Sequence, residues 1–335
     1  MNVLDKYTSQ VVHTSCPGGN SFKKENIPVY KDPLRTWPVK GLAYSNELGA
    51  VVSEISPKVG SALWVPALMY FGADIYDKYK NEDTSYNPSP KRGVKEAVFQ
   101  AMASVVLPTV AIHTGQRAIS SLNRFTKQGL TTQTKQQVLE QSLSYMQSQS
   151  LHKYVDKVDL YKEGFKNSVL TMASDAKGEF KTLSPIKKVF ALLSPLKNND
   201  GIALANEAKL VDFSTKQAEK IFTMRADLMQ NKRPKGLSKR LFKKFQQTQG
   251  EYKKIYPADK YMGKATKSIL KEWNNSQIFK QKMVKTVGGF VALALLAKPI
   301  DDFVEHFVIK KTVEPGLDML SNSFKGKQSK ISSKN

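Results

Sequence analysis

Histidines and serine–lysine pairs are the residues in this sequence whose types could support metal binding or nucleophilic catalysis. The chain contains four histidines: His13, His113, His152 and His306. None stands four residues from another, so the helical pair of an H-E-x-x-H zinc site is absent and we predict no metal site. His113 lies in a strongly apolar run, where an ionisable side chain could line a polar path. A hydrogen-bonded histidine at a helix end is the simpler interpretation.

Two serines stand three residues before a lysine, which is the spacing at which lysine can activate a serine nucleophile. They are Ser184, before Lys187, and Ser194, before Lys197. Each serine also precedes a proline, and this pair commonly starts a helix, so we interpret both serines as helix caps. The phosphate-binding G-x-x-x-x-G-K-S/T and dinucleotide-binding G-x-G-x-x-G patterns are absent. The sequence therefore predicts no catalytic residue and no cofactor.

The composition indicates a folded and strongly basic protein. Of 335 residues, 40% are hydrophobic, which is enough for one or two buried cores. The 52 Lys and Arg residues outnumber the 29 Asp and Glu, and the net charge of +23 favours an anionic partner. The single cysteine, Cys16, allows neither an internal disulfide nor a multi-cysteine metal site. No basic segment followed by an apolar run begins the chain, so no secretory signal is predicted.

Three apolar runs determine the predicted architecture. Serine–proline pairs start the first two, which predict helices over 57–76 and 94–116, each with a proline near its middle. Together these two helices form a predicted hairpin. The third run, 287–297, is too short to span a membrane alone, because a spanning helix needs about 20 apolar residues.

Outside these runs the pattern is amphipathic and helical. Hydrophobic residues recur at three-and-four spacing over 138–158 and 204–228, and no useful strand alternation occurs. We predict an all-α fold, with a helical hairpin of apolar helices, an amphipathic helical region and no substantial sheet. The predicted segments are an irregular N-terminal segment (1–45), the apolar helical hairpin (46–125), an amphipathic helical region (126–230), a lysine-rich basic helical region (231–285), C-terminal apolar helices (286–322) and a disordered basic tail (323–335).

The lysine-rich region indicates the kind of partner. Residues 231–285 contain fourteen lysines and two arginines against three acidic residues, and they directly precede the third apolar run. Such juxtamembrane basic segments bind anionic lipid. We expect the membrane surface to be contacted by six basic side chains: Lys239, Arg240, Lys243, Lys244, Lys253 and Lys254. We expect four aromatic side chains to act as apolar anchors: Trp64, Tyr70, Phe71 and Phe290.

The leading hypothesis is a membrane-associated protein, mostly cytoplasmic, with an anchoring, scaffolding or interaction role. Its partner is an anionic membrane surface, and another protein or a second copy is a further candidate. In the first alternative, the apolar runs form the buried core of a soluble helical domain. A second alternative is a soluble nucleic-acid-binding protein, although the scarcity of arginine in 231–285 favours diffuse electrostatics over specific recognition.

A third alternative is a small transporter or enzyme built around the apolar helices, with His113 or Asp301 in the path. The segment Lys298-Pro299-Ile300-Asp301 resembles the P-x-D helix kink of mitochondrial-type carriers. Those carriers repeat the motif along the chain, whereas Pro66 and Pro108 here lack the following acid. We therefore infer no family and no small-molecule substrate from it.

Overall fold

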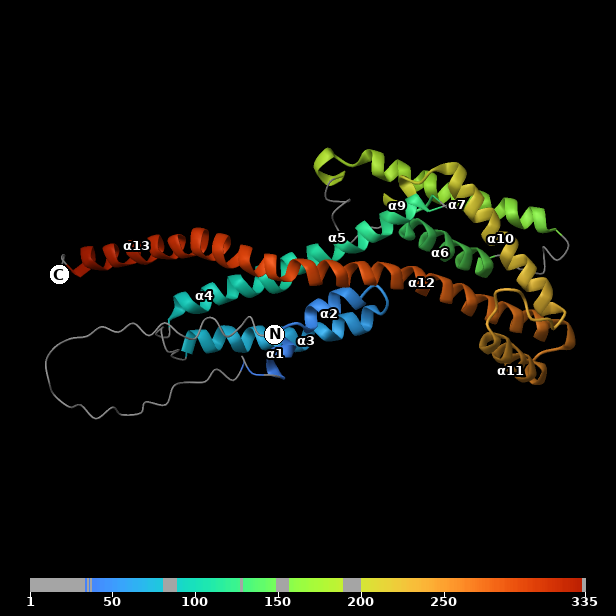
Figure 1. Ribbon diagram of the computed structural model, residues 1–335, viewed down its shortest axis with the longest axis horizontal. Coiled ribbons are helices and arrows are strands. Elements are labelled where there is room, and N and C mark those ends of the chain that lie inside the picture. Colours follow the sequence, from blue (N-terminus) through green and yellow to red (C-terminus); the bar gives the residue numbers. More distant parts are fainter. Residues whose placement is uncertain are drawn as a thin grey trace.

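The computed structural model describes residues 34, 36, 38–80, 89–126, 129–148, 157–188 and 200–332 (Figure 1). Among these residues 88% are helical and none forms a strand, which confirms the predicted all-α fold. Most of the predicted irregular segment 1–45 lies outside the described residues. Its last part forms the short helix α1 (Val39–Leu42) and the start of α2 (Ser45–Val52).

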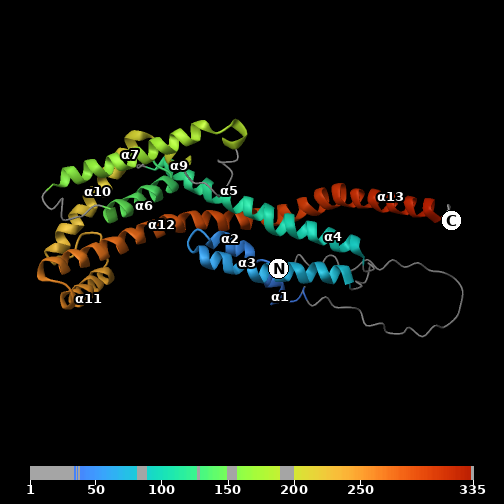
Figure 2. The same cartoon turned by 180° about the vertical axis from the view of Figure 1, so that it is seen from behind.

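One long helix organises the molecule, which is elongated in both ribbon views (Figures 1 and 2). This helix, α12 (Ala258–Phe303), continues without a turn through the π-helix η6 (Val304–Val313) into α13 (Glu314–Ser332). A second long helix runs antiparallel beside it and consists of α4 (Pro90–Phe99), the π-helix η3 (Gln100–Val106) and α5 (Leu107–Leu122), ending in the 3-10 turn η4 (Asn123–Phe125).

The helix α3 (Pro57–Lys80) and α2 pack together beside this pair. α3 begins at Pro57, where the serine–proline pair predicts a helix start, and continues through Pro66 for 24 residues. α4 likewise begins at Pro90, and the Ser89 hydroxyl accepts a hydrogen bond from the Arg92 N–H at 3.2 Å, as a capping serine does. The predicted neighbours 57–76 and 94–116 are therefore adjacent helices.

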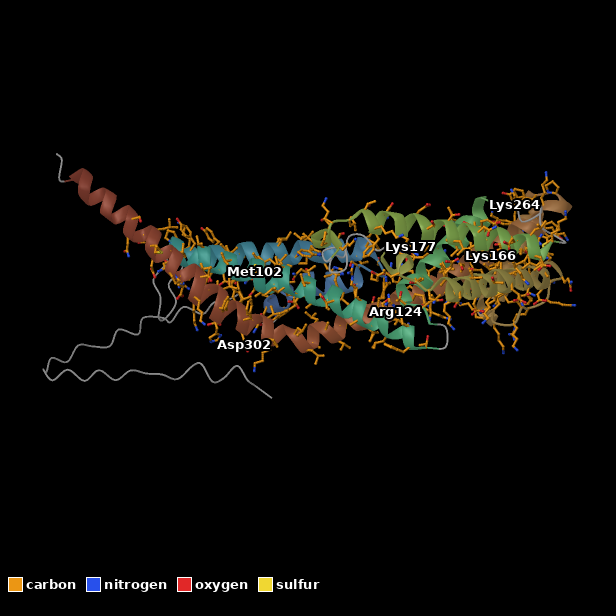
Figure 3. The ribbon with its side chains drawn as sticks, turned by 90° about the horizontal axis from the view of Figure 1, so that it is seen from above. Met102, Arg124, Lys166, Lys177, Lys264 and Asp302 are labelled. Carbon is orange, nitrogen blue, oxygen red and sulfur yellow. The ribbon has the colours of Figure 1, made fainter. Side chains whose placement is uncertain are left out.

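A basic bundle surrounds the first half of α12, at the end where α5 finishes. Its helices are α6 (Thr132–Ser148), α7 (Val158–Thr182), α9 (Asp200–Ala203), α10 (Glu207–Met229) and α11 (Lys239–Ile255). One core lies between α6, α7 and α10 around Tyr161 and Phe165, and a second lies between α10, α11 and α12 around Phe245 and Trp273. In Figure 3, Arg124, Lys166, Lys177 and Lys264 lie in this half of the molecule, whereas Met102 and Asp302 lie in the other.

Glycine pairs allow the apolar helices to touch backbone to backbone. A Cβ atom on Gly288 of α12 would lie 2.6 Å from the Gly115 carbonyl oxygen of α5. A Cβ on Gly49 of α2 would lie 2.7 Å from the Gly60 carbonyl oxygen of α3. Real Cβ atoms do not approach oxygen so closely, so only glycine permits these two crossings. Contacts between small residues are typical of helices that associate inside membranes.

Both π-helices end just before a proline: η3 precedes Pro108 in α5, and η6 precedes Pro315 in α13. A proline inside a helix has no N–H for the carbonyl four residues earlier, and its ring clashes with that carbonyl. The wider π turn relieves this clash. At Pro108 the unused carbonyl belongs to Ser104, and the Asn46 side-chain amide of α2 donates a hydrogen bond to it.

The C-terminal half of the chain differs from the sequence-based expectation in two respects. The third apolar run belongs to a continuous helix from Lys260 to Ser323, so it is not a separate short element. No break occurs at the predicted boundary 285/286 or at Pro299, because the adjacent residues all have helical backbone. The predicted disordered tail also differs, since the described backbone is helical to Ser332 and only 333–335 lie outside the description.

Candidate membrane-contacting surface

A ridge of exposed apolar side chains follows α12. Its members recur every four residues: Phe279, Met283, Val287, Val291 and Leu295. Between 41% and 69% of each of these residues is exposed. The ridge extends for about 24 Å at 1.5 Å per residue. Phe290, Leu296, Phe303 and Phe307 add further exposed apolar area beside and beyond it.

The neighbouring helices also expose apolar side chains. On α3 these are Val59, Val65, Leu68, Met69, Tyr76 and Tyr79, and on the α4–α5 helix they are Val94, Val106, Val110 and Leu122. The basic bundle exposes large apolar residues only in scattered positions, such as Leu160 on α7 and Ile255 on α11. The exposed apolar surface is therefore concentrated on one half of the molecule. Scattered exposed apolar residues are normal, but a continuous surface of this kind needs a covering.

Two helices of the described chain are long and apolar enough to cross a membrane, Pro90–Phe125 and Lys260–Ser323. In their most apolar windows only 28% and 22% of the residues are buried. A helix in the core of a soluble domain is mostly buried, whereas most residues of these two windows are not. The sequence predicts the apolar hairpin from 57–76 and 94–116. The run 57–76 is not one of the two candidate spans, and the second candidate beside α4–α5 is instead α12–α13.

The four predicted aromatic anchors differ in exposure. Phe290 is 41% exposed on α12, and Trp64 is half-buried on α3. Tyr70 and Phe71 are buried, 9% and 6% exposed, and pack against Ala67, Leu34 and Val105. Their side chains therefore hold α3 against its neighbours, while Leu68 and Met69 on the opposite side of the same helix are exposed.

All six predicted basic contacts are exposed on α11: Lys239, Arg240, Lys243, Lys244, Lys253 and Lys254. At about 100° per residue they occupy one half of the helix circumference. Phe245, on the opposite half, is fully buried and fixes α11 to α12. The Lys244 ammonium lies 2.6 Å from a Glu272 carboxylate oxygen of α12, which places this basic face beside Glu272 along α12.

No family model, curated protein or solved structure matches this chain. The function must therefore be inferred from its own residues and their arrangement.

A polar chain crosses between α3 and the start of η3 within the apolar half. The Gln100 amide donates to Asp74 at 2.9 Å and to Glu96 at 2.7 Å, and the Lys78 ammonium lies 3.3 Å from Asp74. Asp74 is 7% exposed and paired. Buried charges inside an apolar layer need such partners. This network therefore fixes α3 against the π-helix.

A second polar junction joins the apolar helices to the bundle. Lys285 of α12 is 4% exposed, forms an ion pair with Glu54 at the end of α2, and donates a hydrogen bond to the Gln133 Oε1 of α6 at 2.6 Å. Three elements thus meet at one ammonium group, two residues before Val287 of the apolar ridge. The sequence shows Lys285 only as the last of many lysines, and no local pattern distinguishes it.

The residues considered for catalysis have ordinary structural roles. The Lys187 N–H donates to the Ser184 hydroxyl at 3.4 Å, which agrees with a helix cap. Ser194 and Lys197 lie outside the described residues, as do His13 and His152. His113 Nδ1 lies 3.1 Å from the Gln116 Oε1 on the same helix. In the described part of the chain no three His, Cys, Asp or Glu side chains gather as a metal site would require.

Proposed function

We propose that this protein is an integral membrane anchor that presents a basic helical bundle to an anionic surface. The α4–α5 and α12–α13 helices enter the bilayer, and the bundle from α6 to α11 stays on the cytoplasmic side. The observation that carries the proposal is the exposed apolar ridge on α12. In water these apolar side chains would stay exposed, whereas the hydrocarbon of a bilayer would cover them. The position of the basic bundle at one end of the apolar helices agrees with the positive-inside tendency.

The basic face of α11 lies away from the anchor. Its level on α12 is that of Glu272, and the central apolar stretch begins at Val287, which is about 22 Å further along the helix at 1.5 Å per residue. The headgroup layer is only about 5–7 Å thick on each side of the hydrocarbon core. Along α12, the face therefore lies beyond the anchor's own headgroups. We infer a tethering or scaffolding role, in which this face binds a second anionic surface.

The decisive experiment places charges on the ridge. In Val291→Arg/Leu295→Arg, two exposed apolar side chains become cations, at a cost of about 2.5–3.5 kcal/mol each at the bilayer centre. After carbonate treatment, membranes are floated on a density gradient. We expect the wild-type protein to float with the lipid and the variant to be lost from that fraction. Flotation separates membrane insertion from aggregation, because aggregates sediment.

Leu160→Arg is the matched control, because Leu160 is 55% exposed on α7 of the bundle, outside the proposed membrane region. It should float as the wild type does. Release of the wild-type protein by carbonate would contradict the integral anchor, and so would equal losses in Leu160→Arg and the ridge variant.

A further inference from the structure

A groove opens between α6, α10 and α12 on the bundle side of the apolar helices. Its volume is about 520 Å³, within the range of small-molecule sites. Three of its lining side chains are lysines, Lys135 from α6 and Lys216 and Lys220 from α10, and Asp212 is the only lining carboxylate. The Lys216 ammonium is 2.9 Å from Asp212 on the same helix, which neutralises one charge. Two cationic groups therefore remain without a lining carboxylate to balance them.

Lys135 is the unusual member of this set. It is 6% exposed, and within the described part of the chain its ammonium group has no hydrogen-bond acceptor or carboxylate partner. Burial lowers the pKa of Lys135, with no neighbouring carboxylate to oppose the shift. An ammonium group that is partly withdrawn from water and has no protein partner opposes folding, because the lost hydration is not replaced. An anion in the groove would supply the missing partner.

The remaining groups of the groove suit an anion attached to an apolar body. The Lys220 ammonium lies 5.0 Å from the centre of the Trp273 ring, which holds this cation at the groove wall. Gln277 and Gln281 of α12 line the groove, and their amides can donate to oxygen atoms. Leu139, Phe213 and Val284 provide apolar lining.

The end of the groove that Lys135 lines lies at the depth of lipid headgroups. Gln133, two residues before Lys135, accepts a hydrogen bond from Lys285, and the central apolar stretch of α12 starts at Val287. Val284 and Asn123 also line the groove, and Asn123 stands just after the end of α5. Lys135 thus lies within one or two helical turns of the proposed hydrocarbon boundary. Phospholipid phosphates occupy that layer.

We propose that the Lys135 end of this groove binds the phosphate group of an anionic phospholipid, with Lys135 as the cationic contact. The proposal rests on the proposed membrane anchor, because that anchor brings the groove to headgroup depth. A free phosphate ester has the same charged group, so the experiment must separate these two sources.

The test uses the full chain in maltoside micelles and isothermal titration calorimetry. The probes are water-soluble dihexanoyl phosphatidic acid, dihexanoyl phosphatidylcholine and inorganic phosphate. We expect the anionic short-chain lipid to bind, and the other two probes to bind at least about 10-fold more weakly. Lys135→Gln should weaken binding of the anionic lipid by about 10- to 100-fold, since it removes a charge-assisted hydrogen bond.

Lys253→Gln is the matched control, because it removes one charge from α11 and leaves the groove intact. It should change the affinity less than about 2-fold. Equal losses in both variants, or no binding of any phosphate probe, would overturn the groove site. Binding of inorganic phosphate as tight as that of the lipid would overturn the lipid source.

These outcomes are distinct from failure of the anchor. If carbonate releases the wild-type chain while the groove still binds phosphatidic acid selectively, the anchor fails and the binding site stands. If the chain remains in the membrane and Lys135→Gln binds the probe as the wild type does, the anchor stands and the groove site fails.

Discussion

At the residue scale, two buried lysines with different surroundings distinguish this protein from an ordinary helical bundle. Lys135 has no hydrogen-bond acceptor or carboxylate partner among the described residues, whereas Lys285 is held by Glu54 and Gln133. The physical difference is in the surroundings: a buried pair with additional hydrogen bonds is compensated, but a single buried ammonium is not. Residues that oppose stability in this way are typical of binding sites, where function limits stability.

Lys135→Met should therefore stabilise the ligand-free protein while it weakens lipid binding. We expect the free energy of unfolding to rise by about 1 kcal/mol, the lower end of the cost of an unpaired buried polar group, because groove water still reaches the ammonium. The folded pKa of Lys135 lies below its unfolded value of 10.5. Between these two values the unfolded chain binds more protons, so wild-type stability increases with pH there.

The gap between wild type and Lys135→Met is consequently largest at neutral pH and narrows as the pH rises towards 10.5. Thermal unfolding of both proteins in the same detergent, at neutral and alkaline pH, measures this. The other charged groups that line the groove are Asp212, Lys216 and Lys220. A lower melting temperature for Lys135→Met at neutral pH would mean that the ammonium already has a stabilising partner.

At the element scale, the apolar helices are positioned by glycine contacts, π turns and the two polar networks rather than by a large apolar core. The sequence contains the glycines and prolines that make this possible, and their helical context predicts close packing. It does not indicate which glycines meet. Gly115 and Gly288 are 173 residues apart in the chain, and only the antiparallel placement of α5 against α12 brings them together.

The substitution Gly288→Ala tests this crossing. The new Cβ would lie 2.6 Å from the Gly115 carbonyl oxygen, so the helices must move apart. We expect a loss of about 1–3 kcal/mol in the free energy of unfolding, the usual cost of overpacking. Gly250→Ala on α11 is the control, because no atom lies within 4 Å of its Cβ position, and it should stabilise the chain by about 0.4–1 kcal/mol.

Chemical denaturation in detergent, followed by circular dichroism, compares the two glycine variants. If Gly288→Ala is as stable as the wild type, α5 and α12 do not cross at this position. The comparison is matched, because both substitutions add one methyl group to a helical glycine.

At the scale of the whole molecule, α12 joins the basic bundle to the apolar half of the molecule. Its first half forms a core with α10 and α11, and its second half carries the exposed apolar ridge. A rigid helix therefore fixes the distance between the anchor and the basic face. This geometry supports tethering more directly than either feature alone.

The triple variant Lys239→Gln/Lys243→Gln/Lys254→Gln tests the basic face. The full chain is reconstituted in zwitterionic nanodiscs and offered anionic vesicles, whose recovery by sedimentation is measured. At about 1 kcal/mol per lysine near an anionic surface, we expect an affinity loss on the order of 100-fold, with a matching decline of wild-type binding in high salt. A control that replaces Lys162, Lys166 and Lys177 of α7 should bind vesicles as the wild type does. Equal effects of the two triple variants would assign the binding to net charge rather than to α11.

The sequence by itself determined the all-α class, the starts of α3 and α4 at serine–proline pairs, and the exposed basic face of α11. These are local properties, set by caps, proline and the three-and-four spacing of apolar residues. Only the tertiary structure decided that the third apolar run belongs to one continuous helix, that Tyr70 and Phe71 are buried, and that Lys135 and Lys285 lie in such different surroundings. The physical reason is that burial and pairing depend on helices distant in the chain. A local sequence window records the charge of a lysine but not the groups that surround it.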